Sequence, residues 1–420
     1  MKVRFTPALF AHAESVLGLL LRFDYPADAI VSRYFREHRE LGHADRAFVA
    51  ETVFAVLRRG RSIEARCAGK LSDRARLLVA LAVTRGWSQR ELAPVLKASE
   101  EDWLAAAKSM PESEFRPAVR CDLPDWLYDR LAAQFGADET LALAAALNQP
   151  APLDLRVNTV KTNREAMLTQ FAAEDIAAFP GSLSPLAIRL RDKPALARHP
   201  LFLAGAFEVQ DEGSQLLGYL LEPKRGEMVV DFCAGAGGKT LLLGALMKNT
   251  GRLYAYDVSD KRLARLKPRL ARSGLSNVHP VRIEHERDTR IKRLSGKVDR
   301  VLVDAPCSGL GTLRRNPDLK WRQDEGSVAE LALKQAAILE AAARLVRPGG
   351  RVVYATCSLL AAENEAIVDA FLATHPEFTL TPAAGVLARH GIELEGDFLR
   401  LLPHRHHTDG FFAAVLDKKS

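Results

Sequence analysis

"VVDFCAGAGGKT", residues 229–240, joins the end of an apolar run to a glycine-rich turn and the start of a helical pattern. Gly235, Gly237 and Gly238 have no Cβ, so the backbone can turn sharply there and approach a bound molecule closely. A turn of this kind between a strand and a helix also presents backbone N–H groups to a ligand. The stretch therefore predicts a strand–loop–helix unit with a ligand against its loop.

The same arrangement repeats downstream. Four more short apolar runs follow: "RLYAYDVS", "VHPVRI", "DRVLVDAP" and "RVVYATCS". Helical patterns separate them, such as 260–274 and 329–346. Strands that alternate with helices predict a mostly parallel sheet covered on both faces. We therefore expect an α/β fold of the doubly wound, Rossmann-like kind, with ligands beyond the carboxyl ends of the strands.

The chain upstream has a different pattern of apolar residues. From Phe10 to about Leu147 apolar residues recur every three or four positions, which predicts helices and almost no strands. From about Pro150 strand and helix patterns alternate. We expect three parts: a helical domain over 1–145, a small α+β linker subdomain over 146–222 and an α/β catalytic domain over 223–420.

The composition is that of an ordinary globular protein, with 48% hydrophobic and 26% charged residues among 420. No apolar stretch reaches the roughly 18 residues of a transmembrane helix, so no membrane partner is expected. The five cysteines are odd in number and widely spaced, which indicates a reducing, cytoplasmic location and no disulfide framework. The net charge of +7 is consistent with an anionic partner such as RNA. We expect a monomer.

Two common nucleotide loops do not match the glycine-rich stretch. A phosphate-binding loop that ends at Gly238 and Lys239 needs glycine where Cys233 stands. A dinucleotide fingerprint that starts at Gly235 needs glycine where Thr240 stands. A nucleoside-type ligand without a phosphate cradle remains, and S-adenosylmethionine fits this description. Asp257, at the end of the second strand, is placed to bind its ribose hydroxyls.

Two cysteines follow the fourth and fifth strands. "DAPCSG", residues 304–309, and "TCS", residues 356–358, place Asp304, Cys307 and Cys357 at one edge if the strands are neighbours. A thiolate that attacks carbon 6 of a pyrimidine activates carbon 5 for methylation, and a nearby acid favours cytosine. The alternative is that Cys357 is a small buried hydrophobe, but its polar neighbours Thr356 and Ser358 count against this.

Four motifs resemble the RsmB/Nop/Sun family of RNA cytosine-5 methyltransferases. They are "DFCAGAGGKT", "DAPCSGLGTLRRNPDLKW", "VYATCSLLAAENE" and "HTDGFFAAVL", in the family's order over roughly 150–420. The helical N-terminal part resembles, more loosely, the NusB-like RNA-binding domain of the bacterial ribosomal-RNA members. The resemblance implies a Rossmann-like methyltransferase domain, S-adenosylmethionine as the cofactor and 5-methylcytosine in RNA as the product.

The resemblance also implies roles for single residues. Cys357 would be the nucleophile, Cys307 would assist release of the product, and Asp304 would bind the cytosine close to the methyl donor. Asp257 would hold the ribose, and Asp288, among Glu284, Glu286 and Asp288 after the third strand, would approach the adenine. The loop that holds the cofactor would be Cys233, Ala234, Gly235, Ala236, Gly237, Gly238 and Lys239.

Contacts to RNA are predicted from "RRNPDLKWRQ", residues 314–323. Arg314, Arg315 and Lys320 with Trp321 suit a single strand with a splayed base, although Trp321 fits a structural role nearly as well. The histidines of "PHRHHTDG" have no carboxylate or cysteine cluster beside them, so no metal site is expected.

Three readings of the function remain. The intact catalytic set favours an active RNA methyltransferase, and the resemblance implies ribosomal RNA as its substrate. Methylation of transfer RNA and a non-catalytic role in ribosome assembly, through RNA binding alone, stay open as alternatives.

Overall fold

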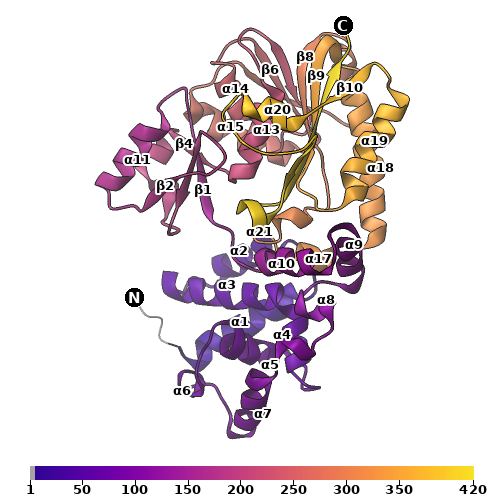
Figure 1. Ribbon diagram of the computed structural model, residues 1–420. Coiled ribbons are helices and arrows are strands. Elements are labelled where there is room, and N and C mark those ends of the chain that lie inside the picture. Colours follow the sequence, from indigo (N-terminus) through magenta and orange to yellow (C-terminus); the bar gives the residue numbers. More distant parts are fainter. Residues whose placement is uncertain (1–4) are drawn as a thin grey trace. The chain divides into compact units, whose positions relative to one another are not determined.

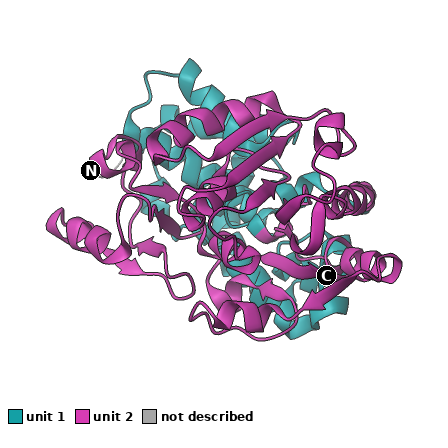
Figure 2. Cartoon of the chain, turned by 90° about the horizontal axis from the view of Figure 1, so that it is seen from above, with its two compact units in different colours: residues 1–150, 312–325 teal, residues 151–311, 326–420 magenta. Residues whose placement is uncertain are grey.

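The computed structural model describes residues 5–420, which form two compact units (Figure 2). One unit comprises the described part of Met1–Pro150 together with Thr312–Glu325, and the other comprises Ala151–Gly311 and Gly326–Ser420. The short segment 312–325 therefore belongs to the N-terminal unit by its contacts, although it lies far from residues 1–150 in the sequence. The predicted division of 146–420 into a linker subdomain and a catalytic domain stays a prediction.

The N-terminal unit is helical throughout its described residues, as predicted. Apolar positions spaced three or four apart give each longer helix a buried face, and these faces form one core around residues such as Leu17, Val53 and Leu78. Thr6 caps the first helix by accepting a hydrogen bond from the Leu9 backbone. Its helices are α1 (Pro7–Leu20), α2 (Ala27–Glu37), α3 (His43–Arg58), α4 (Gly60–Arg66), α5 (Asp73–Val79), α6 (Gln89–Leu92), α7 (Ala98–Ser109), α8 (Pro117–Arg120), α9 (Asp125–Phe135), α10 (Ala137–Leu147) and α17 (Leu319–Arg322).

The second unit begins with a small antiparallel sheet in the order β2-β3-β1-β4. Its strands are β1 (Leu153–Val157), β2 (Ala178–Pro180), β3 (Ala187–Leu190) and β4 (Phe207–Val209). The helix α11 (Arg164–Ala173) lies along this sheet (Figure 1), and its Met167 and Phe171 pack against Leu155 and Phe207. The α+β character expected for this region is confirmed.

A larger sheet follows in the order β10-β12-β9-β8-β5-β6-β7. The five predicted strands are present, and they are parallel to one another. The sheet strands are β5 (Met228–Asp231), β6 (Arg252–Asp257), β7 (Val278–Arg282), β8 (Val298–Asp304), β9 (Val346–Thr356), β10 (Phe378–Thr381), β11 (Leu399–Leu401) and β12 (Phe411–Lys418). The strand β12 pairs antiparallel with β9, β10 and β11. The prediction of a Rossmann-like parallel sheet is confirmed.

Both faces of this sheet are buried, which explains why its strands are almost continuously apolar. Along β9, Val353 packs into one core and Tyr354 into the other, because successive side chains point to opposite faces. Figure 1 shows α18 and α19 side by side on one flank of the sheet. The helices of this unit besides α11 are α12 (Pro200–Leu203), α13 (Glu212–Leu221), α14 (Gly238–Leu246), α15 (Asp260–Ser273), α16 (Thr289–Lys292), α18 (Glu325–Ala343), α19 (Glu365–Thr374), α20 (Ala383–Ala388) and α21 (Pro403–His406).

Within residues 5–420, none of the helices combines the length and the apolar character that a membrane crossing requires.

Candidate active site

A cavity of about 980 Å³ opens where β5, β6, β8 and β9 end. These strands are parallel, so the segments that follow them meet at one edge of the sheet. Most of the residues predicted for the site line this cavity: Cys233, Ala234, Gly235, Ala236, Gly238, Lys239, Asp257, Asp304, Cys307 and Cys357. The structure thus brings together side chains that lie more than a hundred positions apart in the sequence.

The glycine-rich loop turns as its sequence predicts. Gly237 has a φ of 83°, and a Cβ there would lie 2.1 Å from Leu266 Cδ1, so this position needs glycine for both backbone and space. Gly235 donates its backbone N–H to Asp257 Oδ2 at 2.9 Å, and Ser259 N donates to Oδ1 at 2.7 Å. The Asp257 carboxylate is therefore oriented by the backbone on two sides at the rim of the cavity.

Two arginines that the sequence interpretation missed support this loop by binding its carbonyl groups. Arg269 donates through Nη1 to the Ala236 carbonyl at 2.7 Å, and Arg156 donates through Nη1 to the Gly238 carbonyl at 2.6 Å. Glu208 pairs with Arg269 at 2.8 Å. Arg269 lies on α15, and Arg156 lies on β1 of the small sheet. The small sheet therefore contributes to the shape of the loop.

Asp231, at the end of β5, carries an unsatisfied buried atom. Its Oδ2 accepts a hydrogen bond from Thr240 Oγ1 at 2.6 Å, whereas Oδ1 is buried and has no hydrogen-bond partner. Burial raises the pKa of Asp231 to about 7, although the hydrogen bond from Thr240 opposes the shift. Asp231 is among the residues that line the cavity, so a buried oxygen without a hydrogen-bond partner lies beside this space.

Of the acidic residues after β7, Glu284 and Glu286 line the cavity. Asp288 instead caps α16: its carboxylate accepts the backbone N–H of Arg290 at 2.8 Å and that of Glu284 at 3.0 Å. The backbone hydrogen bonds hold the pKa of Asp288 below its usual value. The contact of Asp288 with the adenine stays a prediction. In the structure this carboxylate caps α16.

Cys307 and Cys357 face each other with their Sγ atoms 3.4 Å apart. The hydrogen bond to Cys357 and then burial raise the pKa of Cys307 well above its ordinary value. Cys307 therefore stays a thiol near neutral pH. Burial, and next the charge of Asp304, likewise raise the pKa of the third cavity cysteine, Cys233.

Beside the cysteine pair, Lys239 donates through Nζ to Asp304 Oδ2 at 2.7 Å. Burial alone would lower the pKa of Lys239, but Asp304 outweighs this effect and the pKa is raised. The ammonium also lies 5.7 Å from the centre of the Phe411 ring. Lys239 thus stays charged and holds the carboxylate of Asp304 in place.

The predicted RNA-binding segment contributes to the helical unit. Trp321 Nε1 donates to the Leu57 carbonyl at 2.8 Å, and Lys320, only 1% exposed, donates to the Arg58 carbonyl at 2.8 Å and to Asn148 Oδ1 at 2.9 Å. For Trp321 this contact is the kind expected of a structural role, which was the alternative to RNA binding. Both side chains are packed within this unit, and their polar atoms donate to groups of the same unit. The predicted role of Arg314 and Arg315 remains untested.

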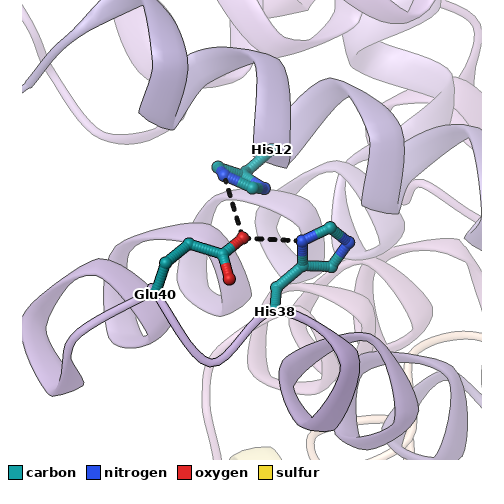
Figure 3. A group of neighbouring side chains, drawn as sticks. All are labelled: His12, His38 and Glu40. Atoms are coloured by element: carbon teal, nitrogen blue, oxygen red, sulfur yellow. Dashed lines mark hydrogen bonds and ion pairs between the residues drawn. The ribbon is translucent and has the colours of Figure 1, made fainter.

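A second polar cluster lies in the helical unit, where His12, His38 and Glu40 converge (Figure 3). His38 Nδ1 lies 2.8 Å and His12 Nε2 lies 3.9 Å from Glu40 Oε1. Tyr34 bonds His12 Nδ1 at 2.8 Å and stacks on His38. The sequence interpretation did not single out these residues, and their mutual contacts account for the arrangement.

Comparisons with known proteins agree with the geometry. A family model described as 16S rRNA methyltransferase RsmB/F matches residues 218–417, and one described as an RsmF/B-like ferredoxin-like domain matches 123–196. The probable ribosomal RNA small subunit methyltransferase B of Synechocystis sp. is 33% identical over 96% of this chain and 98% of its own length. The corresponding enzyme of Sodalis glossinidius is 39% identical over 73% of this chain and 68% of its own. The crystal structure of PH0851 matches with a TM-score of 0.81 at 28% identity, over 100% of both chains.

Proposed function

Because this chain belongs to the RsmB/F family of 16S rRNA methyltransferases, we propose that it methylates carbon 5 of a cytosine in ribosomal RNA through a covalent adduct with Cys357. The observation that carries the proposal is the pair of facing cysteines, 3.4 Å apart, beside the Asp304–Lys239 ion pair in one cavity. A thiolate at this place shares the cavity with the carboxylate of Asp304 and has a second thiol at hydrogen-bonding distance.

The resemblance to the family assigns the nucleophile to Cys357 among the three cavity cysteines. Cys233 and Cys307 both have raised pKa values and remain protonated near neutral pH. The Sγ atoms of Cys307 and Cys357 lie 3.4 Å apart, so Cys307 is placed to act on the sulfur of Cys357 when the adduct breaks down. We therefore assign the attack to Cys357 and the release to Cys307.

In the first step the sulfur of Cys357 forms a bond to carbon 6, and the electrons of the C5–C6 double bond move toward carbon 5. Asp304, fixed by Lys239, accepts a hydrogen bond from the exocyclic amine and so selects cytosine. After methylation the carbon 5 proton leaves to a base, the double bond reforms and the bond between carbon 6 and the sulfur breaks. Cys307 hydrogen-bonds the departing sulfur and favours this release.

The cavity residues fit S-adenosylmethionine, which supplies an electrophilic methyl group on a sulfonium centre. The unsatisfied Oδ1 of Asp231 would accept from its ammonium, and the oriented carboxylate of Asp257 would accept from its ribose hydroxyls. Glu284 or Glu286 would approach the adenine, since both line the cavity. The loop from Cys233 to Lys239 would lie along the cofactor, supported by Arg156 and Arg269.

The test compares Cys357→Ala with Cys307→Ala, and Cys121→Ala, a buried cysteine of the helical unit, serves as the matched control. With labelled cofactor and 16S rRNA transcripts, we expect Cys357→Ala to transfer no methyl group while it still binds the cofactor. We expect Cys307→Ala to accumulate a protein–RNA species that survives a denaturing gel, because attack proceeds and release stalls. The control should methylate at the unmodified rate.

Activity retained by Cys357→Ala would remove Cys357 from the nucleophile role. Methyl transfer to transfer-RNA transcripts but not to 16S rRNA would show that transfer RNA is the substrate. Binding of RNA without transfer by the unmodified protein would favour the assembly-factor alternative.

A further inference from the structure

Glu363 is a fully buried carboxylate, 0% exposed, that lies between the two loops carrying the cysteines. It ends a short turn of 3-10 helix, Ala361–Glu363, that follows β9. Its Oε1 accepts the backbone N–H of Ser308 at 2.8 Å and Nε2 of Gln335 at 2.9 Å. Its Oε2 accepts the hydroxyl of Ser308 at 2.5 Å and that of Ser358. Four donors from three segments thus converge on one side chain.

The two serines are the immediate neighbours of the cysteines. Ser308 follows Cys307 and Ser358 follows Cys357, so a tether on the serines restricts the positions of both sulfur atoms. The backbone of Glu363 is itself held, because the buried Tyr354 on β9 donates its hydroxyl to the Glu363 carbonyl at 2.6 Å. The carboxylate is therefore anchored to the sheet and not to a mobile surface segment.

We propose that Glu363 is a positioning residue that holds the loops of Cys307 and Cys357 at the separation their chemistry needs. The proposal rests on the proposed function for its catalytic meaning, although the tether itself is a statement about geometry. A carboxylate suits the role because it only accepts, and every group that faces it, two hydroxyls, one backbone N–H and one amide, donates.

Energetics point the same way. Burying a carboxylate is costly unless hydrogen bonds compensate for its lost hydration, and here four donors do so. Removing the side chain would take away the acceptor that these four donors share and weaken the connection between the loops, although Ser308 Oγ would still lie 3.2 Å from Ser358 Oγ. Gln335 also donates to the Pro306 carbonyl at 2.9 Å, and Gly311 N donates to the Cys357 carbonyl at 2.8 Å, so some contact between the loops would remain.

The first experiment measures the distance between the two sulfur atoms by chemistry. Diamide oxidises two nearby thiols to a disulfide, taking up their two protons and two electrons to become a hydrazine. We compare the full-length protein with Glu363→Ala, Glu363→Gln and the control Glu365→Gln, whose carboxylate pairs with Arg400 instead. The Cys307–Cys357 disulfide is quantified over time by peptide mass mapping, and folding is checked by circular dichroism and thermal unfolding.

We expect Glu363→Ala to form the disulfide at least about tenfold more slowly, because the effective concentration of one thiol near the other falls. Glu363→Gln, which keeps the shape and one acceptor oxygen, should recover part of the rate, and Glu365→Gln should match the unmodified protein. A folded Glu363→Ala variant that forms the disulfide at the unmodified rate would overturn the proposal. If Glu363→Ala does not fold, Ser308→Ala and Ser358→Ala remove single donors, and unchanged rates in both would overturn it as well.

The second experiment measures methyl transfer by the same variants. A misplacement of about 1 Å can cost a factor of about a hundred in rate, so Glu363→Ala should lower kcat strongly and leave KM for the cofactor unchanged. Glu363 does not contact the cavity, and for this reason a rise of KM with an unchanged kcat would count against a positioning role. If the unmodified protein transfers no methyl group, the proposed function is wrong. The positioning role of Glu363 is still tested in that case, because the rates of disulfide formation do not depend on methyl transfer.

Discussion

The protonation states of the charged side chains around the cavity depend on burial and on the nearest polar or charged partner. Asp231 and Lys239 lie within ten positions of each other, yet their pKa values move for different reasons. Asp231 is buried beside a hydroxyl and its pKa rises to about 7, whereas Lys239 is stabilised as a cation by Asp304. The cavity therefore combines the Lys239–Asp304 ion pair with a carboxyl group, that of Asp231, whose charge changes near neutral pH.

This carboxyl group gives a prediction for cofactor binding. Asp231→Asn should weaken binding of S-adenosylmethionine by about 1.5–3 kcal/mol at pH 8, because a hydrogen bond to a charged group is lost. In the unmodified protein affinity should rise with pH through about 7, as Asp231 loses its proton and can pair with the ammonium. Asp231→Asn should flatten this dependence.

Isothermal titration calorimetry at pH 6, 7 and 8 measures both effects. Asp299→Asn is the control, because Asp299 lies at the opposite end of the neighbouring strand β8 and binds Met228 N and Arg347. An unchanged affinity of Asp231→Asn at every pH would exclude Asp231 from the cofactor site.

At the scale of elements, α17 has structural contacts within the helical unit although its residue types also suit RNA. The basic and aromatic residues of 314–321 suit RNA by composition, but Lys320 and Trp321 donate to carbonyls at the end of α3. Burial lowers the pKa of Lys320 to about 7, although Asp122 opposes the shift. The segment is a structural part of the helical unit.

Lys320 should therefore make the stability of this unit depend on pH. Its folded-state pKa of about 7 lies below the unfolded value of about 10.4, so the unfolded state binds more protons between these values. The free energy of unfolding should rise with pH in this range by up to about 1.4 kcal/mol per unit, and Lys320→Met should remove this slope.

Intrinsic fluorescence is a suitable probe, because all four tryptophans, Trp87, Trp103, Trp126 and Trp321, belong to the helical unit. Urea unfolding of both proteins is followed at pH 7, 8 and 9. Equal slopes against pH in the two proteins would show that Lys320 is not buried as a titrating group.

At the scale of the whole molecule, the two compact units are not two consecutive stretches of chain. Residues 312–325 leave the second unit directly after the Cys307 loop, pack in the first unit and return through α18. A cut at the boundary near residue 150 therefore separates the helical unit from a part of its own core, since Trp321 packs against that core.

A fragment of residues 1–150 should for this reason be less stable than the same fragment carrying 312–325 on a glycine–serine linker. Loss of a packed tryptophan from a core costs about 3 kcal/mol or more. Urea unfolding followed by fluorescence compares the two fragments. Coincident unfolding curves would mean that the segment adds nothing to the unit.

The sequence by itself determined the elements of this protein and the chemistry at their ends. Hydrophobic periodicity is a local property, so the helical N-terminal region, the five parallel strands and the glycine turn could be predicted. The positions of Asp304, Cys307 and Cys357 followed, because parallel strands end at one edge of a sheet. Thr356 and Ser358, whose polarity set Cys357 apart from a packing cysteine, hydrogen-bond to Asn364 and Glu363.

Only the tertiary structure decided which distant groups meet. Glu363 between the cysteine loops, Arg156 and Arg269 behind the glycine turn, and Lys320 inside the helical unit are all long-range contacts. The hydrophobic periodicity of the sequence does not indicate these contacts. A buried charge needs partners that compensate for its lost hydration, and here those partners come from distant parts of the chain.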